Sequence, residues 1–145
     1  MSAALFKREK IITVKENSPN QLIVEGYLKD DFHHISCILY LGYPSFEIKA
    51  VEVDFLAVPM QACREAAKIK DSLLGLKIKP GFLTRIRKSV GGAQGCIHLA
   101  ELLYDMGQVA FQSSRKIINR TISDAEIEEK SREFMQGRCV AFKES

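Results

Sequence analysis

The chain has 145 residues, of which 46% are hydrophobic and 27% are charged, and its formal net charge is +3 at pH 7. This length and composition favour one soluble domain over residues 1–145, and the small net charge argues against a nucleic-acid partner. No apolar run approaches the roughly 20 residues of a membrane span, and the N-terminus lacks the apolar segment of a signal peptide. We therefore expect a cytoplasmic protein without a membrane attachment.

The first part of the chain has the alternating, β-branched pattern of β-strands. Residues 10–15 and 22–29 are separated by the turn-rich segment ENSPNQ, and a third run, residues 34–41, ends at the turn sequence GYPS. A fourth run over residues 46–55 changes its alternation at Lys49–Ala50, which predicts a β-bulge there. The short connections between these runs predict an antiparallel meander of four strands.

After Pro59 the hydrophobic residues recur with a helical period. The last of the expected helices has the capping-box pattern at its start, with Ser123 followed three residues later by Glu126. Strands followed by helices, rather than alternating with them, predict an α+β domain in which three or four helices pack on one face of the sheet. The expected helices cover residues 60–75, 80–90, 95–120 and 121–137.

The segment GGAQGCIH, residues 91–98, places Cys96 and His98 where the third helix is expected to begin. The unpaired N–H groups and partial positive charge of a helix N-terminus stabilise a thiolate and make a cysteine there more nucleophilic. We expect Gly92 and Gly95 to permit the tight turn by adopting positive φ. The two side chains can share a metal ion, or His98 can act as a base for Cys96. Alternatively, the glycines only end one helix and admit the next, with Cys96 buried.

Three other groups of residues are weaker candidates. The segment DDFHH, residues 30–34, gathers two carboxylates and two imidazoles at the start of a strand, although a solvated turn explains it nearly as well. Cys63 lies among alanines in an expected helix, a pattern more typical of a core thiol. Cys37 and Cys139 show no pattern of pairing, and without a CxxC pair in a reducing compartment we expect no disulfides.

Several motifs, in this order, resemble those of the bacterial family known as domain of unknown function 2889. They are DDFHHI, PxxxC ending at Cys63, LxGLxIxxGF ending at Phe82, GGxxGCxHLxEL starting at Gly91, and AxQ starting at Ala110. The resemblance covers nearly the whole chain. It implies no particular activity.

The chain also resembles, more distantly, the iron–sulfur scaffold proteins of the NifU and IscU type and their SufE relatives. In those proteins a small antiparallel sheet leads into helices, and the metal-binding groups lie at a strand start, after the last strand and at the start of a late helix. The first cysteine of the scaffold pattern is missing here, so the resemblance implies a single Zn²⁺ or Fe²⁺ ion more readily than an iron–sulfur cluster, because borderline metals accept both imidazole and thiolate. The ligands that it implies are Cys63, Cys96, His98, His34 and Asp31.

Three functions follow from these patterns. The first is a protein that binds a metal ion or iron–sulfur species and passes it to a protein partner, in which case Cys63, Cys96, His98 and part of residues 30–34 should converge on one ion. The second is a thiol enzyme or persulfide carrier, with Cys96 as the catalytic nucleophile and His98 as the nearby base. The third is a non-catalytic interaction module whose cysteines are structural. Metal content separates the first from the others, and thiol reactivity separates the second from the third.

Overall fold

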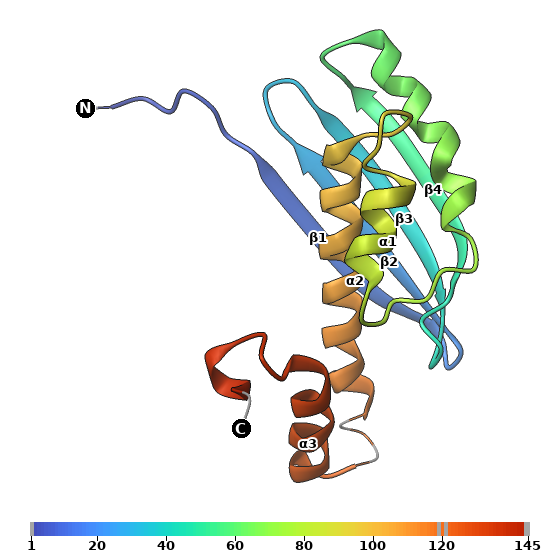
Figure 1. Ribbon diagram of the computed structural model, residues 1–145, viewed down its shortest axis with the longest axis vertical. Coiled ribbons are helices and arrows are strands. Elements are labelled where there is room, and N and C mark those ends of the chain that lie inside the picture. The colour runs from blue at the N-terminus through green and yellow to red at the C-terminus, as the bar shows by residue number, and fades with distance from the viewer. Residues whose placement is uncertain (1, 119, 121, 144–145) are drawn as a thin grey trace. The chain divides into compact units, whose positions relative to one another are not determined.

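The computed structural model describes residues 2–118, 120 and 122–143. Four strands precede the helices, which confirms the expected α+β fold (Figure 1). The strands are β1 (Glu9–Ser18), β2 (Gln21–Lys29), β3 (His34–Gly42) and β4 (Ile48–Ala57). The helices are the 3₁₀ helix η1 (Gln61–Leu73), α1 (Phe82–Ser89), α2 (Ile97–Ile118), α3 (Asp124–Met135) and the short 3₁₀ helix η2 (Val140–Phe142).

The strands form one sheet in the order β1-β2-β3-β4, and each neighbouring pair is antiparallel. This arrangement confirms the predicted meander. Tyr40 on β3 pairs with Ala50, whereas the next residue, Leu41, pairs with Ile48, so that Lys49 is an extra residue on β4. The predicted bulge at Lys49–Ala50 is thereby confirmed, and it is the reason why the hydrophobic alternation changes phase there.

The chain divides into two compact units, Met1–Ala110 and Phe111–Ser145, and α2 contributes residues to both. The first unit holds the sheet, η1, α1 and the beginning of α2. The second unit holds the end of α2, α3 and η2. The expectation of a single domain over residues 1–145 stays a prediction.

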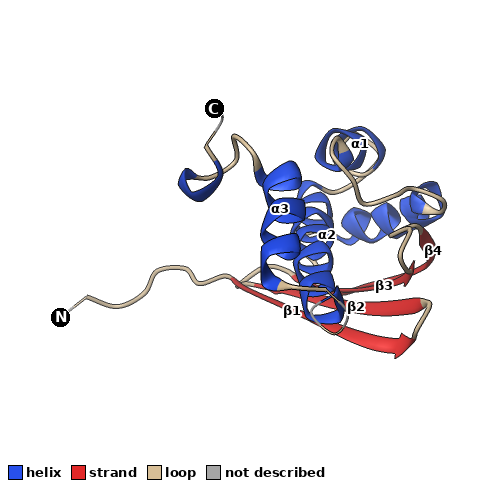
Figure 2. Ribbon diagram, turned by 90° about the horizontal axis from the view of Figure 1, so that it is seen from below, coloured by secondary structure: helices blue, strands red, loops and turns tan. Residues whose placement is uncertain are grey.

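In the first unit, η1, α1 and the beginning of α2 cover one face of the sheet (Figure 2). Alternate residues of β2 and β3 point into the core between sheet and helices. Gly26 on β2 lets α2 approach closely, because a Cβ atom there would lie 2.5 Å from the sulfur of Met106. Cys37 is fully buried in this core, as expected of a packing residue, and burial raises the pKa of its thiol to about 12. The fully buried residues include Leu22, Leu28, Ile35, Leu39, Leu41, Ile86, Leu99, Leu102, Leu103 and Met106.

Two expected helices differ in detail from the structure, and the fourth agrees closely. The segment expected as the first helix forms the 3₁₀ helix η1, and α2 begins at Ile97 rather than near Gly95. At the start of α3, the Ser123 hydroxyl accepts a hydrogen bond from the Glu126 backbone N–H, and the Glu126 carboxylate accepts one from the Ser123 N–H. The predicted capping box is therefore confirmed.

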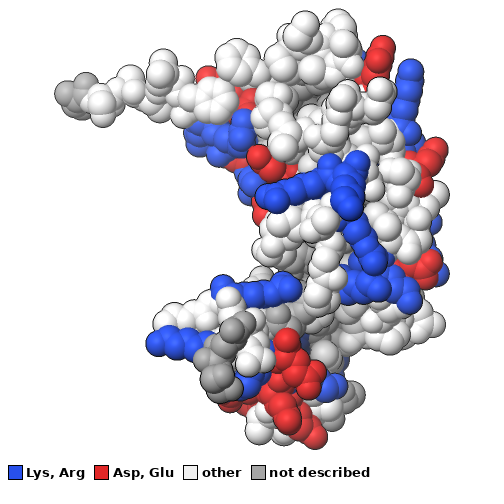
Figure 3. All heavy atoms as spheres, in the orientation of Figure 1, with Lys and Arg blue, Asp and Glu red and all other residues white. Residues whose placement is uncertain are grey.

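On the face shown in Figure 3, acidic side chains lie among the basic ones, in keeping with the small net charge of the chain. None of the helices in the described part of the chain combines the length and the apolar character that a membrane crossing requires.

Candidate functional site

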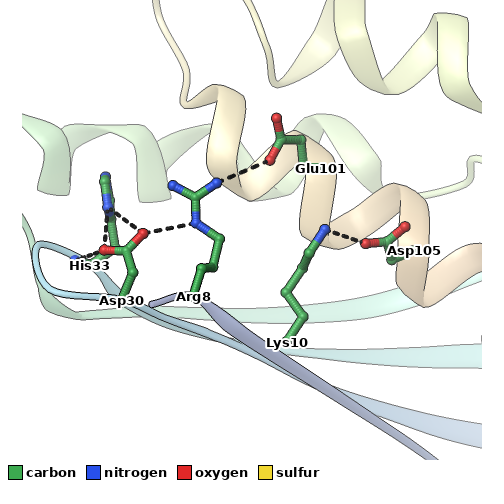
Figure 4. A network of polar contacts seen from close by, with 6 residues as sticks. All are labelled: Arg8, Lys10, Asp30, His33, Glu101 and Asp105. Atoms are coloured by element: carbon green, nitrogen blue, oxygen red, sulfur yellow. Dashed lines mark hydrogen bonds and ion pairs between the residues drawn. The ribbon is translucent and has the colours of Figure 1, made fainter. Parts of the chain in front are cut away.

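The candidate site is built around Asp30, in the turn between β2 and β3 (Figure 4). Its side chain is 0% exposed. The backbone N–H groups of Phe32 and His33 donate hydrogen bonds to Asp30 Oδ1 at 2.8 and 2.7 Å, and the Arg8 Nε donates to Oδ2 at 2.9 Å. The Nδ1 atom of His33 lies 3.0 Å from Oδ1. Asp30 therefore both closes the turn and fixes the orientation of the His33 ring.

The surroundings of Asp30 keep its carboxyl group ionised. Burial by itself would raise the pKa of Asp30, since a charge is costly to remove from water. The hydrogen bonds from the Phe32 backbone, from Arg8 and from His33 together outweigh burial, so the pKa of Asp30 lies well below its usual value. A buried, ionised carboxylate is thus held next to the imidazole of His33.

The rings of His33 and His98 contact each other, with centroids 4.1 Å apart and planes inclined by 38°. The side chain of His33 is 11% exposed, and His98 lies in the first turn of α2. Burial, followed by the nearby His33 and Arg8, lowers the pKa of His98, and this effect exceeds the opposing influence of Glu101 and Asp30. Neutral imidazole is therefore the favoured form of His98 at neutral pH.

The tautomer of His33 follows from its partner. A hydrogen atom on Nδ1 can be donated to the Asp30 carboxylate, which leaves the lone pair on Nε2. A neutral imidazole with a free lone pair can bind a metal ion or accept a proton. The site therefore offers two adjacent imidazoles, one of which is oriented by a carboxylate.

Two ion pairs connect β1 and the residues before it to α2 (Figure 4). Arg8, which bonds Asp30, also places Nη1 3.9 Å from the Glu101 carboxylate, and Lys10 Nζ lies 2.6 Å from Asp105. Because both acidic residues lie on the first turns of α2, these pairs help to hold the helix start next to the β2–β3 turn.

Cys96 lies directly before α2, where its carbonyl oxygen accepts a hydrogen bond from Ala100 and its N–H donates to the Val90 carbonyl. Gly95 is required here for close approach, because a Cβ atom would lie 2.6 Å from the Val90 carbonyl carbon. The prediction that Gly92 and Gly95 adopt positive φ is wrong, because the chain turns at this point with negative or extended φ. Gly95 is therefore needed at this turn because a side chain has no room there, and not because the backbone has a positive φ.

The structure brings the three regions of the predicted metal site to the same end of the sheet, but it does not make them converge. In the part of the chain that the structure describes, no group of three or more His, Cys, Asp or Glu side chains is close enough to hold a metal ion. Cys63 lies in the first turn of η1, where the neighbouring Arg64 bonds the Phe55 carbonyl of β4. His98 instead contacts the β2–β3 turn.

The predicted ligands are therefore divided among different surroundings. The ring of His98 contacts His33 in the cluster around Asp30, whereas no side-chain hydrogen bond or ion pair among the described residues joins that cluster to Cys63, Cys96, His34 or Asp31. Iron–sulfur clusters are held by four cysteine or histidine ligands. The described residues do not bring such a set of ligands together in one place.

Within the segment DDFHH, the cluster contains other residues than the two selected from the sequence as ligands. Sequence reasoning selected Asp31 and His34, whereas the structure places Asp30 and His33 in the cluster. The alternation along β3 distinguishes the two histidines. Its odd-numbered residues Ile35, Cys37, Leu39 and Leu41 are buried, and His33 continues this series toward the buried face of the sheet. His34 belongs to the even-numbered series, which lies on the other face of the sheet. The contribution of Arg8 had no sequence signal, since it lies 22 residues from its partner Asp30.

A family model described as "Protein of unknown function (DUF2889)" matches residues 12–112. The matched segment contains most of β1, all of β2 to β4, and the cluster of Asp30, His33 and His98, whereas Arg8 precedes it. No curated protein and no solved structure matches the chain. The resemblance to NifU, IscU and SufE stays a prediction. The family match covers well over half of the residues, and the chain belongs to the DUF2889 family of proteins of unknown function.

Proposed function

We propose that this protein binds a borderline divalent metal ion, Zn²⁺ or Fe²⁺, through the imidazoles of His33 and His98. The observation that carries the proposal is the 4.1 Å contact between the two rings beside a carboxylate that orients one of them. Metal-binding histidines almost always donate the second ring N–H to a carboxylate, a carbonyl or water, which fixes the ring and increases its basicity. Asp30 and His33 have this relation.

Two imidazoles leave coordination positions for other ligands, because Zn²⁺ is usually four-coordinate. Water or a group on a partner molecule would occupy these positions. An ion with open positions suits transient binding and transfer to a partner better than a structural role. The exposed ring of Phe32 lies 5.9 Å from that of Phe6, next to Arg8, and this pair would provide an apolar contact for a partner protein.

A reducing cytoplasm is the compartment that we propose, since all four cysteines are free thiols.

The three histidines of the chain provide a matched test of this proposal. Replacing His33 or His98 with alanine is expected to weaken Zn²⁺ binding about tenfold or more, because each removes one of two protein ligands. His34→Ala removes the histidine next in sequence and should leave the affinity unchanged. Calorimetric titration with Zn²⁺ and the visible absorption of the Co²⁺ form measure the effect. If wild-type protein shows no saturable binding, or if His34→Ala is as damaging as the other two variants, the proposal fails.

Protonation should compete with the metal at this site. Imidazole binds a metal ion only in its neutral form, and burial lowers the pKa of His98, so the Zn²⁺ affinity is expected to hold at neutral pH and to fall in acid, below the usual histidine pKa of about 6.5. The same calorimetric titration, repeated in buffers of decreasing pH, measures this dependence. A pH-independent affinity would argue that carboxylates rather than imidazoles hold the ion.

The thiol-enzyme alternative depends on Cys96, and the described residues show no hydrogen bond between its sulfur and either imidazole. We therefore expect Cys96→Ser to keep both the Zn²⁺ affinity and the melting temperature near those of the wild type, because serine is well tolerated at a helix start. Zn²⁺ titration and thermal unfolding of this variant provide the measurement. Loss of binding equal to that of His98→Ala would instead identify Cys96 as a ligand.

A further inference from the structure

The second compact unit has a cavity of about 380 Å³, open to solvent on one side, between the end of α2, α3 and η2. This volume lies in the range of small-molecule sites, which are mostly apolar with a few placed polar groups. Every residue that lines the cavity belongs to the second unit, so the cavity is separate from the histidine pair. Its apolar wall is formed by Phe111, Ile118, Ile127, Met135 and Phe142.

Local sequence patterns build this wall. On α2, Phe111, Arg115 and Ile118 are spaced by four and three residues and so share one helix face. Gly137, with φ of +72°, turns the chain after α3, and its N–H donates to the Phe142 carbonyl at 2.7 Å. This turn brings Phe142 back to the cavity, where the Arg132 guanidinium lies 5.6 Å from the ring centroid.

The charged residues of the lining are all positive. Arg115 comes from α2 and Lys130 from α3, and the lining contains no acidic residue. Within the described chain neither cation forms an ion pair, whereas Arg132 on α3 pairs with Glu128. An apolar cavity bordered by two exposed cations that have no ion-pair partner in the described chain is complementary to a molecule with an apolar body and an anionic head.

We propose that this cavity binds a small amphiphilic anion, a carboxylate with an aliphatic tail. The carboxylate lies between Arg115 and Lys130, and the tail packs against Phe111, Ile127 and Phe142. Nearly all of the lining lies beyond residue 112, where the family match ends. The proposal is therefore independent of metal binding and concerns a part of this chain that the family model does not match.

Octanoate, octanol and octylammonium test the proposal on the full chain, because they share a tail and differ in head charge. Calorimetric titration is expected to show the tightest binding for octanoate and the weakest for octylammonium. The double variant Arg115→Gln/Lys130→Gln should lose about tenfold or more in octanoate affinity, since charge-assisted hydrogen bonds are removed. The control Lys116→Gln/Lys143→Gln removes the same charge from two exposed residues outside the lining and should bind octanoate like the wild type.

Cys139 reports occupancy of the same cavity, since it lines the cavity and its thiol is free and exposed. Octanoate should slow alkylation of Cys139 by iodoacetamide and leave the rate at Cys96 unchanged, as measured by mass spectrometry of peptides. Equal binding of the three probes, unchanged octanoate affinity in the double variant, or no protection of Cys139 would each overturn the proposal. Unchanged circular dichroism and melting temperature establish that the variants are folded.

Discussion

Replacing Gly95 with alanine is expected to lower the free energy of unfolding by about 3 kcal/mol or more, because the added methyl group has no space. It would collide with the Val90 carbonyl oxygen and lie 2.8 Å from Ile69 Cδ1. The carbonyl cannot easily move, because it accepts the hydrogen bond of the Cys96 N–H at 2.7 Å and Val90 is fully buried. The expected result is a loose connection between α1 and α2, or failure to fold.

Gly92→Ala is the matched control for this variant. Gly92 is exposed, and the nearest atom to its added Cβ, the Lys88 carbonyl oxygen, is 4.0 Å away. Both changes reduce the conformational entropy of the unfolded chain by a similar amount, so their difference isolates the collision at Gly95. Urea unfolding followed by circular dichroism measures both variants. Equal stabilities of the two variants would show that the turn can open without cost.

Replacing Asp30 with asparagine is expected to destabilise the metal-free protein by about 2–3 kcal/mol at neutral pH. Asparagine can still accept the backbone hydrogen bonds of Phe32 and His33, but it carries no charge to balance Arg8. Its amide group would also present a donor where Arg8 and His33 require an acceptor. Asp31, the exposed residue next to Asp30, provides the control. Asp31→Asn should change the free energy of unfolding by less than about 0.5 kcal/mol.

The effect of Asp30→Asn should depend on pH, because the folded protein holds the pKa of Asp30 below its usual value. The stabilisation is complete above the unfolded pKa, about 4, and it is lost as the pH falls through the lower, folded pKa. The stability difference between wild type and Asp30→Asn should therefore be constant between about pH 5 and 7 and shrink below about pH 4. Urea unfolding at several pH values measures it, and an unchanged difference at pH 3 would contradict an ionised Asp30.

The fold was largely predictable from the sequence because its signals are local. Each strand shows its alternation over ten residues or fewer, and the phase change at Lys49 marks the bulge on its own. The capping box needs only Ser123 and Glu126. The 3₁₀ form of η1 was not predictable, since 3₁₀ and α-helices place apolar residues at nearly the same spacing.

The candidate site was predictable only in part. The sequence identified His98 and the segment that contains His33, and the alternation of β3 can select His33 over His34. The convergence of Cys63 with Cys96 and His98 could not be judged from spacing, because shared location at one end of a sheet still permits separations too large for a metal ion.

By itself, the sequence determined the order of the strands and helices, the bulge, the helix cap and the family of the chain, since each depends on residues close together along the chain or on a linear motif. Tertiary structure alone decided that Arg8 joins Asp30, that His33 contacts His98, and that Gly95 has no room for a side chain. These contacts join residues far apart in the sequence. The distances between them depend on how α2 packs on the sheet. Packing is sensitive to fractions of an ångström, and the hydrophobic pattern of a short sequence segment does not determine it.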